Sequence, residues 1–323
     1  MRSVHGVALS LDDASTNILR PWLDPETARS GSPMVEVRVA PRGAEPLPVL
    51  ELLLEERDAW LGRTARGLLI GGIGRAWFSI EGAPAVVRSG GLAEELEPSD
   101  PSRSLLLAAL IVALRTMGVY ALHAGVVCND NSALVLLGES GAGKSTTTAA
   151  LVSAGYGYLG DDEVLLRDAR GSAELIAYWP KFRLTERVLP TFAQLSAHLS
   201  PLGANPKWEL DAASAFPGRG LSHWGGPITL LFLSRSAEEG SNLLPISLAE
   251  SMGLLIAQST ALGLSCHPNP REHLDLLARF ARRARRARLE LGHEWLADPV
   301  GASRRLSEAL GSRLTLTTGP EAS

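Results

Sequence analysis

Lysine is scarce in this chain of 323 residues. Of its 31 basic lysine and arginine residues, only Lys144, Lys181 and Lys207 are lysines. Arginine has taken almost every other basic position, so each lysine says something about its own site. The formal net charge is only −4, which gives the whole chain no strong attraction to nucleic acid or to an anionic membrane surface. We therefore expect neither as a partner.

Cysteines and long apolar runs are also few. Cys128 and Cys266 can form at most one bridge, which excludes the disulfide framework of a small secreted scaffold. The most apolar run, residues 105–114, is too short to span a bilayer and is typical of a buried helix. The N-terminal residues lack the apolar core of a secretory signal peptide. A cytoplasmic location is the expectation that follows.

The remaining composition is that of an ordinary globular protein, with 45% hydrophobic and 20% charged residues. In the first hundred residues, short apolar stretches alternate with Gly, Pro and Ser, which predicts a small β-rich N-terminal domain over residues 1–98. Within it, residues 48–60 are also compatible with a helix. Acidic residues and two prolines cluster over residues 95–101 and suggest a boundary. Residues 99–323 would form the second domain.

The second domain contains both helix and strand patterns. Its first helix would be capped by Asp100 and would end at Gly118. Two strands joined by a turn at residues 129–132 read as a hairpin, and a second hairpin turns at residues 168–172. The other expected elements are helices over residues 144–153, 186–198, 247–258, 271–286 and 301–310, and a strand over residues 228–234.

A glycine-rich loop follows the strand over residues 133–137. Residues 138–145 read Gly-Glu-Ser-Gly-Ala-Gly-Lys-Ser and match G-x-x-x-x-G-K-[ST], the pattern that cradles nucleotide phosphates. With three lysines in the chain, roughly 0.004 matches are expected by chance. An apolar strand before the loop and a helix-forming run after it agree with this interpretation. The sequence therefore predicts a site for ATP with Mg²⁺.

The chemistry of the loop assigns its parts. Glycines allow successive backbone N–H groups to turn toward an anion, and the following helix directs its positive N-terminal end at the same phosphates. The Lys144 side chain would reach the β- and γ-phosphates, and the Ser145 hydroxyl would bind Mg²⁺. The predicted nucleotide-binding residues are Gly138, Glu139, Ser140, Gly141, Ala142, Gly143, Lys144, Ser145 and Thr146.

The rest of the sequence excludes several classes of protein with such a loop. Each lysine is preceded by Gly or Pro, so the N-K-x-D element that reads guanine in GTPases is absent. No segment resembles the L-S-G-G-Q sequence of transporter ATPases. The best later strand, over residues 228–234, ends in Ser-Arg-Ser with no carboxylate for a metal. A GTPase, a transporter ATPase and the commonest ATPase arrangement are therefore disfavoured.

Acidic residues appear early instead. Asp161, Asp162 and Glu163 follow Lys144 by only seventeen to nineteen positions, which lets the chain form one helix and return to the strand end beside the loop. One carboxylate there would hold Mg²⁺, and a second would accept a proton from an attacking hydroxyl. The spacing thus favours phosphoryl transfer.

Together, Leu122-His123-Ala124, the loop over residues 138–145 and Gly160-Asp161-Asp162-Glu163-Val164 resemble the HPr kinase/phosphorylase family, whose fold is shared with ATP-dependent phosphoenolpyruvate carboxykinase. The resemblance is strong over residues 119–167, and residues 285–291 resemble the closing strand of such proteins. It implies an α/β P-loop kinase domain of this type beside the β-rich N-terminal domain.

The resemblance also implies roles for individual residues. Lys144 would bind the transferred phosphoryl, Ser145 and Asp162 would bind Mg²⁺, and Asp161 would be the catalytic base with His123 close by. The roles of Asp161 and Asp162 are open to exchange. A second cation from Lys207 or Arg219 is an alternative to the simpler interpretation of both as surface residues.

One feature of the family is missing. Bifunctional HPr kinases carry a glycine-rich segment of the form E-x-R-G-x-G after the Asp pair, and this chain does not. The better comparison is with HPr-kinase-related proteins, some of which phosphorylate a serine of a small ribosomal peptide. The expected function is therefore an ATP-dependent serine kinase whose partner is a peptide or small-protein acceptor. A kinase for a small-molecule hydroxyl and a non-catalytic ATP-binding regulatory subunit are the alternatives.

Overall fold

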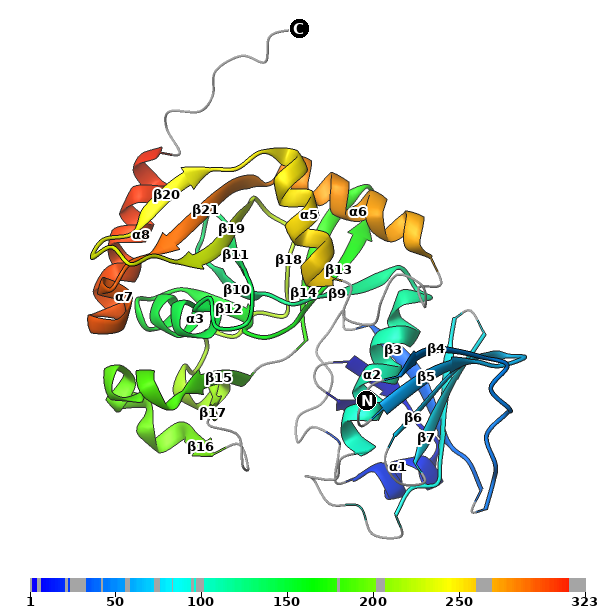
Figure 1. Ribbon diagram of the computed structural model, residues 1–323. Coiled ribbons are helices and arrows are strands. Elements are labelled where there is room, and N and C mark those ends of the chain that lie inside the picture. The colour runs from blue at the N-terminus through cyan, green and yellow to red at the C-terminus, as the bar shows by residue number, and fades with distance from the viewer. Residues whose placement is uncertain are drawn as a thin grey trace, which may run out of the picture. The chain divides into compact units, whose positions relative to one another are not determined.

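The computed structural model describes the chain over residues 2–4, 7–20, 23, 33–41, 43–55, 59–72, 76–82, 84–93, 96, 102–178, 181–201, 207–259 and 269–313. These residues form a mixed α/β protein with several sheets (Figure 1). The chain divides into two compact units. The first comprises Met1–Ala121, Leu165–Tyr178 and Ser259–Leu277, and the second comprises Leu122–Val164, Trp179–Gln258 and Ala278–Ser323.

The first unit is built on an eight-stranded sheet with the order β1-β2-β3-β8-β7-β6-β5-β4. Val35, Val37, Phe78 and Val87 are buried in it, at alternate positions of their strands. Its strands are β1 (Arg2–Val4), β2 (Val7–Ser10), β3 (Met34–Val39), β4 (Glu51–Glu55), β5 (Ala59–Arg63), β6 (Gly67–Gly72), β7 (Trp77–Glu81) and β8 (Val86–Gly90), with the short helix α1 (Asp13–Leu19) after β2.

Helix α2 (Ser102–Arg115) packs on this sheet against β3, β6, β7 and β8. The apolar run over residues 105–114 forms most of it and is largely buried, as the sequence predicts. The expected cap Asp100 lies outside the described residues. The same unit holds β9 (Val119–Leu122), β13 (Val164–Ala169) and β14 (Ser172–Ala177), which are neighbours in the order β14-β13-β9. The predicted hairpin at residues 168–172 is therefore confirmed.

The second unit is built on a six-stranded sheet with the order β12-β10-β11-β19-β21-β20. Strands β11, β19 and β21 are parallel at its centre, and the outer strands run antiparallel to their neighbours. The six strands are β10 (Gly125–Cys128), β11 (Ala133–Leu137), β12 (Gly157–Gly160), β19 (Ile228–Arg235), β20 (Asn242–Pro245) and β21 (Arg285–Leu291).

One face of this sheet carries the main core of the unit. Leu134, Leu136, Leu231, Leu233 and Leu289 alternate along the three central strands and enter one buried cluster. Helix α3 (Lys144–Ser153) packs against β10, β11 and β12 and against α8 (Figure 1). The cluster is completed by α7 (Glu294–Ala297), α8 (Pro299–Arg313), the 3₁₀ segment η2 (Glu186–His198) and a small sheet with the order β15-β17-β16.

The small sheet consists of β15 (Lys181–Thr185), β16 (Leu199–Pro201) and β17 (Lys207–Asp211). The remaining described elements are α4 (Ala212–Ala215), β18 (His223–Trp224), α5 (Leu248–Ser259) and α6 (Pro270–Arg283). Among the described residues, no helix is both long enough and apolar enough to cross a membrane.

Two secondary-structure expectations are wrong. The described part of residues 48–60 contains no helix, because β4 and the start of β5 lie there and pair with each other antiparallel. The helix expected over residues 271–286 ends at Arg283, since the next two arginines already belong to β21, where they pair with Thr229 and Leu230 of β19. Residues 186–198 are helical, but of the 3₁₀ type, with Pro190 inside.

Candidate active site

The glycine-rich loop joins the end of β11 to the start of α3. Three of its glycines have positive φ, at 151° for Gly138, 84° for Gly141 and 110° for Gly143. Residues other than glycine rarely adopt this backbone conformation. A Cβ on Gly138 would also come within 2.7 Å of the Leu233 carbonyl oxygen. The residues from Glu139 to Gly141 are exposed. The loop is thus folded tightly against β19 and presents its outer turn to solvent.

The Lys144 side chain turns back over this loop. Its Nζ donates to the carbonyl oxygens of Gly138 at 2.7 Å and Glu139 at 3.3 Å, and the residue is only 7% exposed. Burial lowers the pKa of the Lys144 ammonium, while the charges of Asp161 and Asp162 raise it. The loop therefore holds a positive charge in a nearly enclosed position, as an anion site requires.

Asp161 follows β12 and is completely buried. Its Oδ2 accepts the backbone N–H of Arg183 at 3.2 Å, whereas its Oδ1 has no hydrogen-bond partner among the described residues. Burial raises the pKa of the Asp161 carboxyl to about 6. The hydroxyl of Ser145, the Arg183 N–H and the hydroxyl of Thr148 act in the opposite direction. A buried carboxylate oxygen without a partner beside a serine hydroxyl fits a divalent cation.

A glycine on β10 keeps space open at this point. A Cβ added to Gly125 would lie 2.3 Å from Thr148 Oγ1 and 3.6 Å from Asp161 Oδ1. Thr148 Oγ1 itself donates to the Lys144 carbonyl oxygen at 2.9 Å. The donor set of Ser145 and Asp161 consists of oxygens, which suits Mg²⁺. In the part of the chain that the structure describes, no group of three or more His, Cys, Asp or Glu side chains could hold a metal ion. Ser145 and Asp161 therefore suit a cation that takes its other ligands from phosphate oxygens.

Asp162 has a different environment from its neighbour. Its Oδ2 accepts from Nη1 of Arg183 at 2.8 Å, and its Oδ1 lies 3.4 Å from Nδ1 of His123. The Asp162 side chain is 28% exposed and that of His123 is 38% exposed. Burial and the charge of Lys144 lower the pKa of the His123 imidazole, although Asp162 raises it. The imidazole is therefore mainly neutral at pH 7.

His123 is anchored to the same loop through α5. Its backbone N–H donates to the Gln258 carbonyl oxygen at 2.9 Å. With the Gln258 amide oriented to satisfy its hydrogen bonds, its nitrogen donates to the carbonyl oxygens of Gly138 at 3.2 Å and His123 at 3.3 Å. The end of α5 thus fixes His123, which lies between β9 and β10, relative to the first residue of the loop.

Lys207 and Arg219, the two candidates for a second cation, have different surroundings. The charge of Lys207, at the start of β17, contributes to lowering the pKa of both His123 and Lys144. Arg219 instead donates through Nη1 to the carbonyl oxygen of Gly155, beyond the C-terminal end of α3. Of the two candidates, Lys207 is the one whose charge acts on the site.

Two further arginines, Arg183 and Arg235, contact the site, and neither belongs to a recognisable sequence motif. Arg183 lies on β15, where no motif marks it, and its role comes from the pairing of β15 with β17 beside the end of β12. Arg235 ends β19 and donates through Nε to the Gly141 carbonyl oxygen at 2.7 Å. The sequence Ser-Arg-Ser at the end of that strand contains Arg235, and an arginine so close to a phosphate loop is a signal for anion binding. The predicted loop residues Glu139 and Ser140 line a separate pocket together with Phe232, Leu254 and Arg288.

Comparisons with known proteins add little. No family model matches the chain, and no curated protein matches it. Among solved structures, the HPr(Ser) kinase/phosphatase from Coxiella burnetii is similar with a TM-score of 0.29 and 13% sequence identity, over 58% of this chain and 98% of that one. Similarity at this level defines neither family nor activity, so the function has to be inferred from the chain's own residues.

Proposed function

We propose that this protein is an ATP-dependent kinase that transfers the γ-phosphoryl group of ATP to a hydroxyl, with a serine of a peptide or small protein as the acceptor. The observation that carries the proposal is the convergence of a glycine-rich loop, its enclosed lysine and two adjacent carboxylates of different environment. Lys144 Nζ lies over the loop, and the charges of Asp161 and Asp162 both act on it. This combination supplies anion binding, charge compensation and a proton acceptor within one site.

The backbone N–H groups of residues 138–143 and the start of α3 would bind the phosphates, as the sequence predicts. Lys144 would leave the carbonyl oxygens of Gly138 and Glu139 and bind the β- and γ-phosphates. Mg²⁺ bound with the nucleotide would neutralise the charge that develops on these phosphates. Ser145 and one aspartate would hold it.

The environments of the two aspartates favour the exchanged assignment that the sequence left open. Asp161 is the carboxylate whose pKa the Ser145 hydroxyl affects, and it is fully buried with one free oxygen, which suits the metal. Asp162 is partly exposed and contacts His123 and Arg183, so an acceptor hydroxyl can reach it. We therefore assign Asp161 to Mg²⁺ and Asp162 to the base.

The chemical step is a displacement at phosphorus. The acceptor oxygen forms a bond to the γ-phosphorus while the bond from that phosphorus to the β,γ-bridging oxygen breaks, and ADP leaves with the electron pair. The hydroxyl proton passes to the Asp162 carboxylate. His123 positions this carboxylate through Oδ1, and Arg183 through Oδ2. Lys207 adds positive charge near Lys144, where the transferred group carries its negative charge.

The proposal is tested with γ-labelled ATP, Mg²⁺ and serine-containing peptides, including those encoded beside this protein. Label is expected on peptide serine with wild-type protein and not with Lys144→Ala, which would also lose ATP affinity. Label on a metabolite with no peptide acceptor would indicate a small-molecule kinase. Tight ATP binding without transfer to any acceptor would contradict the kinase proposal and favour a regulatory subunit.

A further inference from the structure

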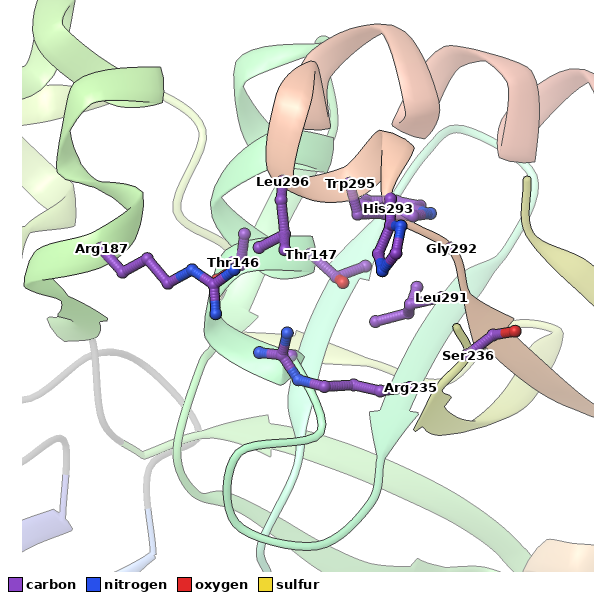
Figure 2. Close-up of a pocket in the computed structure, with 11 residues that line it drawn as sticks. Thr146, Thr147, Arg187, Arg235, Ser236, Leu291, Gly292, His293, Trp295 and Leu296 are labelled. Atoms are coloured by element: carbon purple, nitrogen blue, oxygen red, sulfur yellow. The ribbon is translucent and has the colours of Figure 1, made fainter. Parts of the chain in front are cut away.

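A pocket opens beside the first turn of α3, within the second unit (Figure 2), and neither Asp161 nor Asp162 lines it. Its walls come from the start of α3, the ends of β19 and β21, η2 and α7. The parallel strands β19 and β21 have their carboxyl ends at the same edge of the sheet as β11, whose end leads into the phosphate loop. Crevices at the carboxyl ends of parallel strands are the usual ligand sites of α/β sheets.

One polar atom in this pocket is buried and unused. Thr147 is fully buried, and its Oγ1 has no hydrogen-bond partner among the residues that the structure describes. Figure 2 shows this oxygen directed into the pocket between α3 and Leu291. A hydroxyl kept in this state costs stability unless something else bonds to it. A ligand with its own hydroxyl or ring nitrogen would satisfy it.

Two arginines stand at the mouth of the pocket. Figure 2 shows the guanidinium groups of Arg187 and Arg235 extending toward each other across it. Arg235 is held beside the phosphate loop by its bond to the Gly141 carbonyl oxygen, whereas Arg187 comes from η2. Neither has an ion-pair partner within the described part of the chain. A planar guanidinium can pair with a phosphate or stack on an aromatic ring.

The opposite wall is mainly apolar, with the His293 ring beside it. Leu291, Trp295 and Leu296 line it, and Trp295 Nε1 is already bonded to Ser241 Oγ at 2.9 Å, so its ring is fixed. The loop approaches this wall closely, because a Cβ on Gly143 would lie 2.7 Å from Leu291 Cδ1. The pocket thus adjoins the phosphate loop and combines apolar side chains and an imidazole with two cations and an unpaired hydroxyl.

We propose that this pocket binds the nucleoside of the nucleotide, with the base between the apolar wall and Arg187, and the α-phosphate beside Arg235. The inference rests on the proposed function, because it assumes a triphosphate on the loop. The γ-phosphate end must point toward Asp161 and Asp162. The other end of the triphosphate then leaves the loop past Thr146, at the mouth of this pocket. Thr147 Oγ1 bonds to the ribose or the base.

The test compares two ligands, ATP and inorganic tripolyphosphate, each with Mg²⁺, by isothermal titration calorimetry on the full chain. Arg187→Ala removes the cation that comes from η2, and Leu296→Trp places a bulky ring at a half-buried residue whose side chain points into the pocket in Figure 2. Both variants are expected to bind ATP about tenfold more weakly or worse and to bind tripolyphosphate like the wild type. Arg304→Ala, an exposed arginine on α8, is the matched control and should change neither affinity.

Three outcomes would overturn the inference or its basis. Wild-type affinity for ATP in both Arg187→Ala and Leu296→Trp would show that the nucleoside lies elsewhere. Equal loss of ATP and tripolyphosphate in both would show damage to the phosphate loop and no separate nucleoside pocket. If the wild type binds tripolyphosphate no better than Lys144→Ala does, the failure is that of the proposed function, and the two are thereby distinguished.

Discussion

At the scale of single residues, two adjacent carboxylates have been given unlike surroundings. Asp161 is buried with one oxygen unpaired, and Asp162 is partly exposed between Arg183 and His123. Burial disfavours the charged form of the first, whereas the second lies between the Arg183 guanidinium, at 2.8 Å, and the His123 ring. The pair can therefore divide metal binding and proton acceptance between its members.

The first prediction concerns the charge on Asp161. Its pKa is about 6 in the folded protein and 3.8 in its ordinary state, so the folded chain holds this proton more tightly than the unfolded chain. Stability should therefore fall as pH rises from about 4 to about 6, by up to about 3 kcal/mol. Asp161→Asn cannot ionise and should be more stable than the wild type at pH 7 by about 1–3 kcal/mol, with no such gain at pH 4. Urea unfolding at both pH values measures it.

Mg²⁺ should reverse this difference. A cation at Asp161 favours its charged form, so Mg²⁺ with ADP should raise the thermal midpoint of the wild type more than that of Asp161→Asn. Asp130→Asn, at an exposed residue of the β10–β11 turn, is the control and should behave like the wild type. Equal Mg²⁺ effects in the wild type and Asp161→Asn would place the metal elsewhere.

The sequence was informative about these residues only where a motif marks them. The loop is predictable because its glycines and lysine are spaced to bind phosphate, and the Asp pair because it follows the loop by one helix. Which aspartate is buried was not predictable, because both stand in the same turn and only the packing of β15 on the end of β12 separates them. Arg183 is not predictable for the same reason. Its backbone N–H bonds to Asp161 and its guanidinium to Asp162, each more than twenty residues away in the sequence.

At the scale of elements, β10 and α3 approach each other closely at Gly125. A Cβ there would meet Thr148 Oγ1 at 2.3 Å. Gly125→Ala should therefore force α3 from the strand and destabilise the protein by about 1–3 kcal/mol. It should also weaken the Mg²⁺ effect, since the added methyl enters the space beside Asp161 Oδ1. Urea unfolding and thermal midpoints with Mg²⁺ measure the two effects.

Gly253→Ala is the matched control for that substitution. Gly253 lies within α5, and nothing stands within 4 Å of an added Cβ. Alanine there should be neutral or stabilising by about 0.5–1 kcal/mol, because it favours the helix. A Gly125→Ala protein as stable as Gly253→Ala would mean that the contact between β10 and α3 is looser than described.

Elements with a strong local signal were predictable, and those decided by distant pairing were not. The buried helix α2, the turn at Asn129 and the strand before the loop follow from local pattern. Asn129 Oδ1 indeed accepts from the N–H groups of Asn131 and Ser132, each at 2.9 Å. The run of leucines in β4 is compatible with either a helix or a strand by local propensity. It forms a strand because β5 pairs with it. The arginine-rich end of α6 becomes strand because β19 offers it a partner.

At the scale of the whole molecule, the compact units divide at Ala121, while the sequence suggests a boundary near residue 98. A break at residue 98 would separate α2 from β6 and β7, against which it packs. Leu110 of α2 is fully buried, so Leu110→Ala should cost about 2–5 kcal/mol in the first unit. We expect it to lower a thermal transition that ATP does not shift.

Leu136→Ala provides the comparison. Leu136 is fully buried on β11, in the core that supports the phosphate loop, and its loss should lower the transition that ATP raises. If Leu110→Ala shifts the ATP-sensitive transition by as much as Leu136→Ala does, α2 is energetically part of the loop-bearing unit, and the boundary near residue 98 is the better one.

The central claim is that Asp162 accepts the proton in a phosphoryl transfer from ATP bound on the loop. A single-turnover experiment with pre-bound γ-labelled ATP and an acceptor peptide tests it most directly. Asp162→Asn should bind ATP within about threefold of the wild type and transfer label at least about 100-fold more slowly, while Asp130→Asn should match the wild type in both. Transfer by Asp162→Asn at the wild-type rate, with ATP bound, would contradict the account.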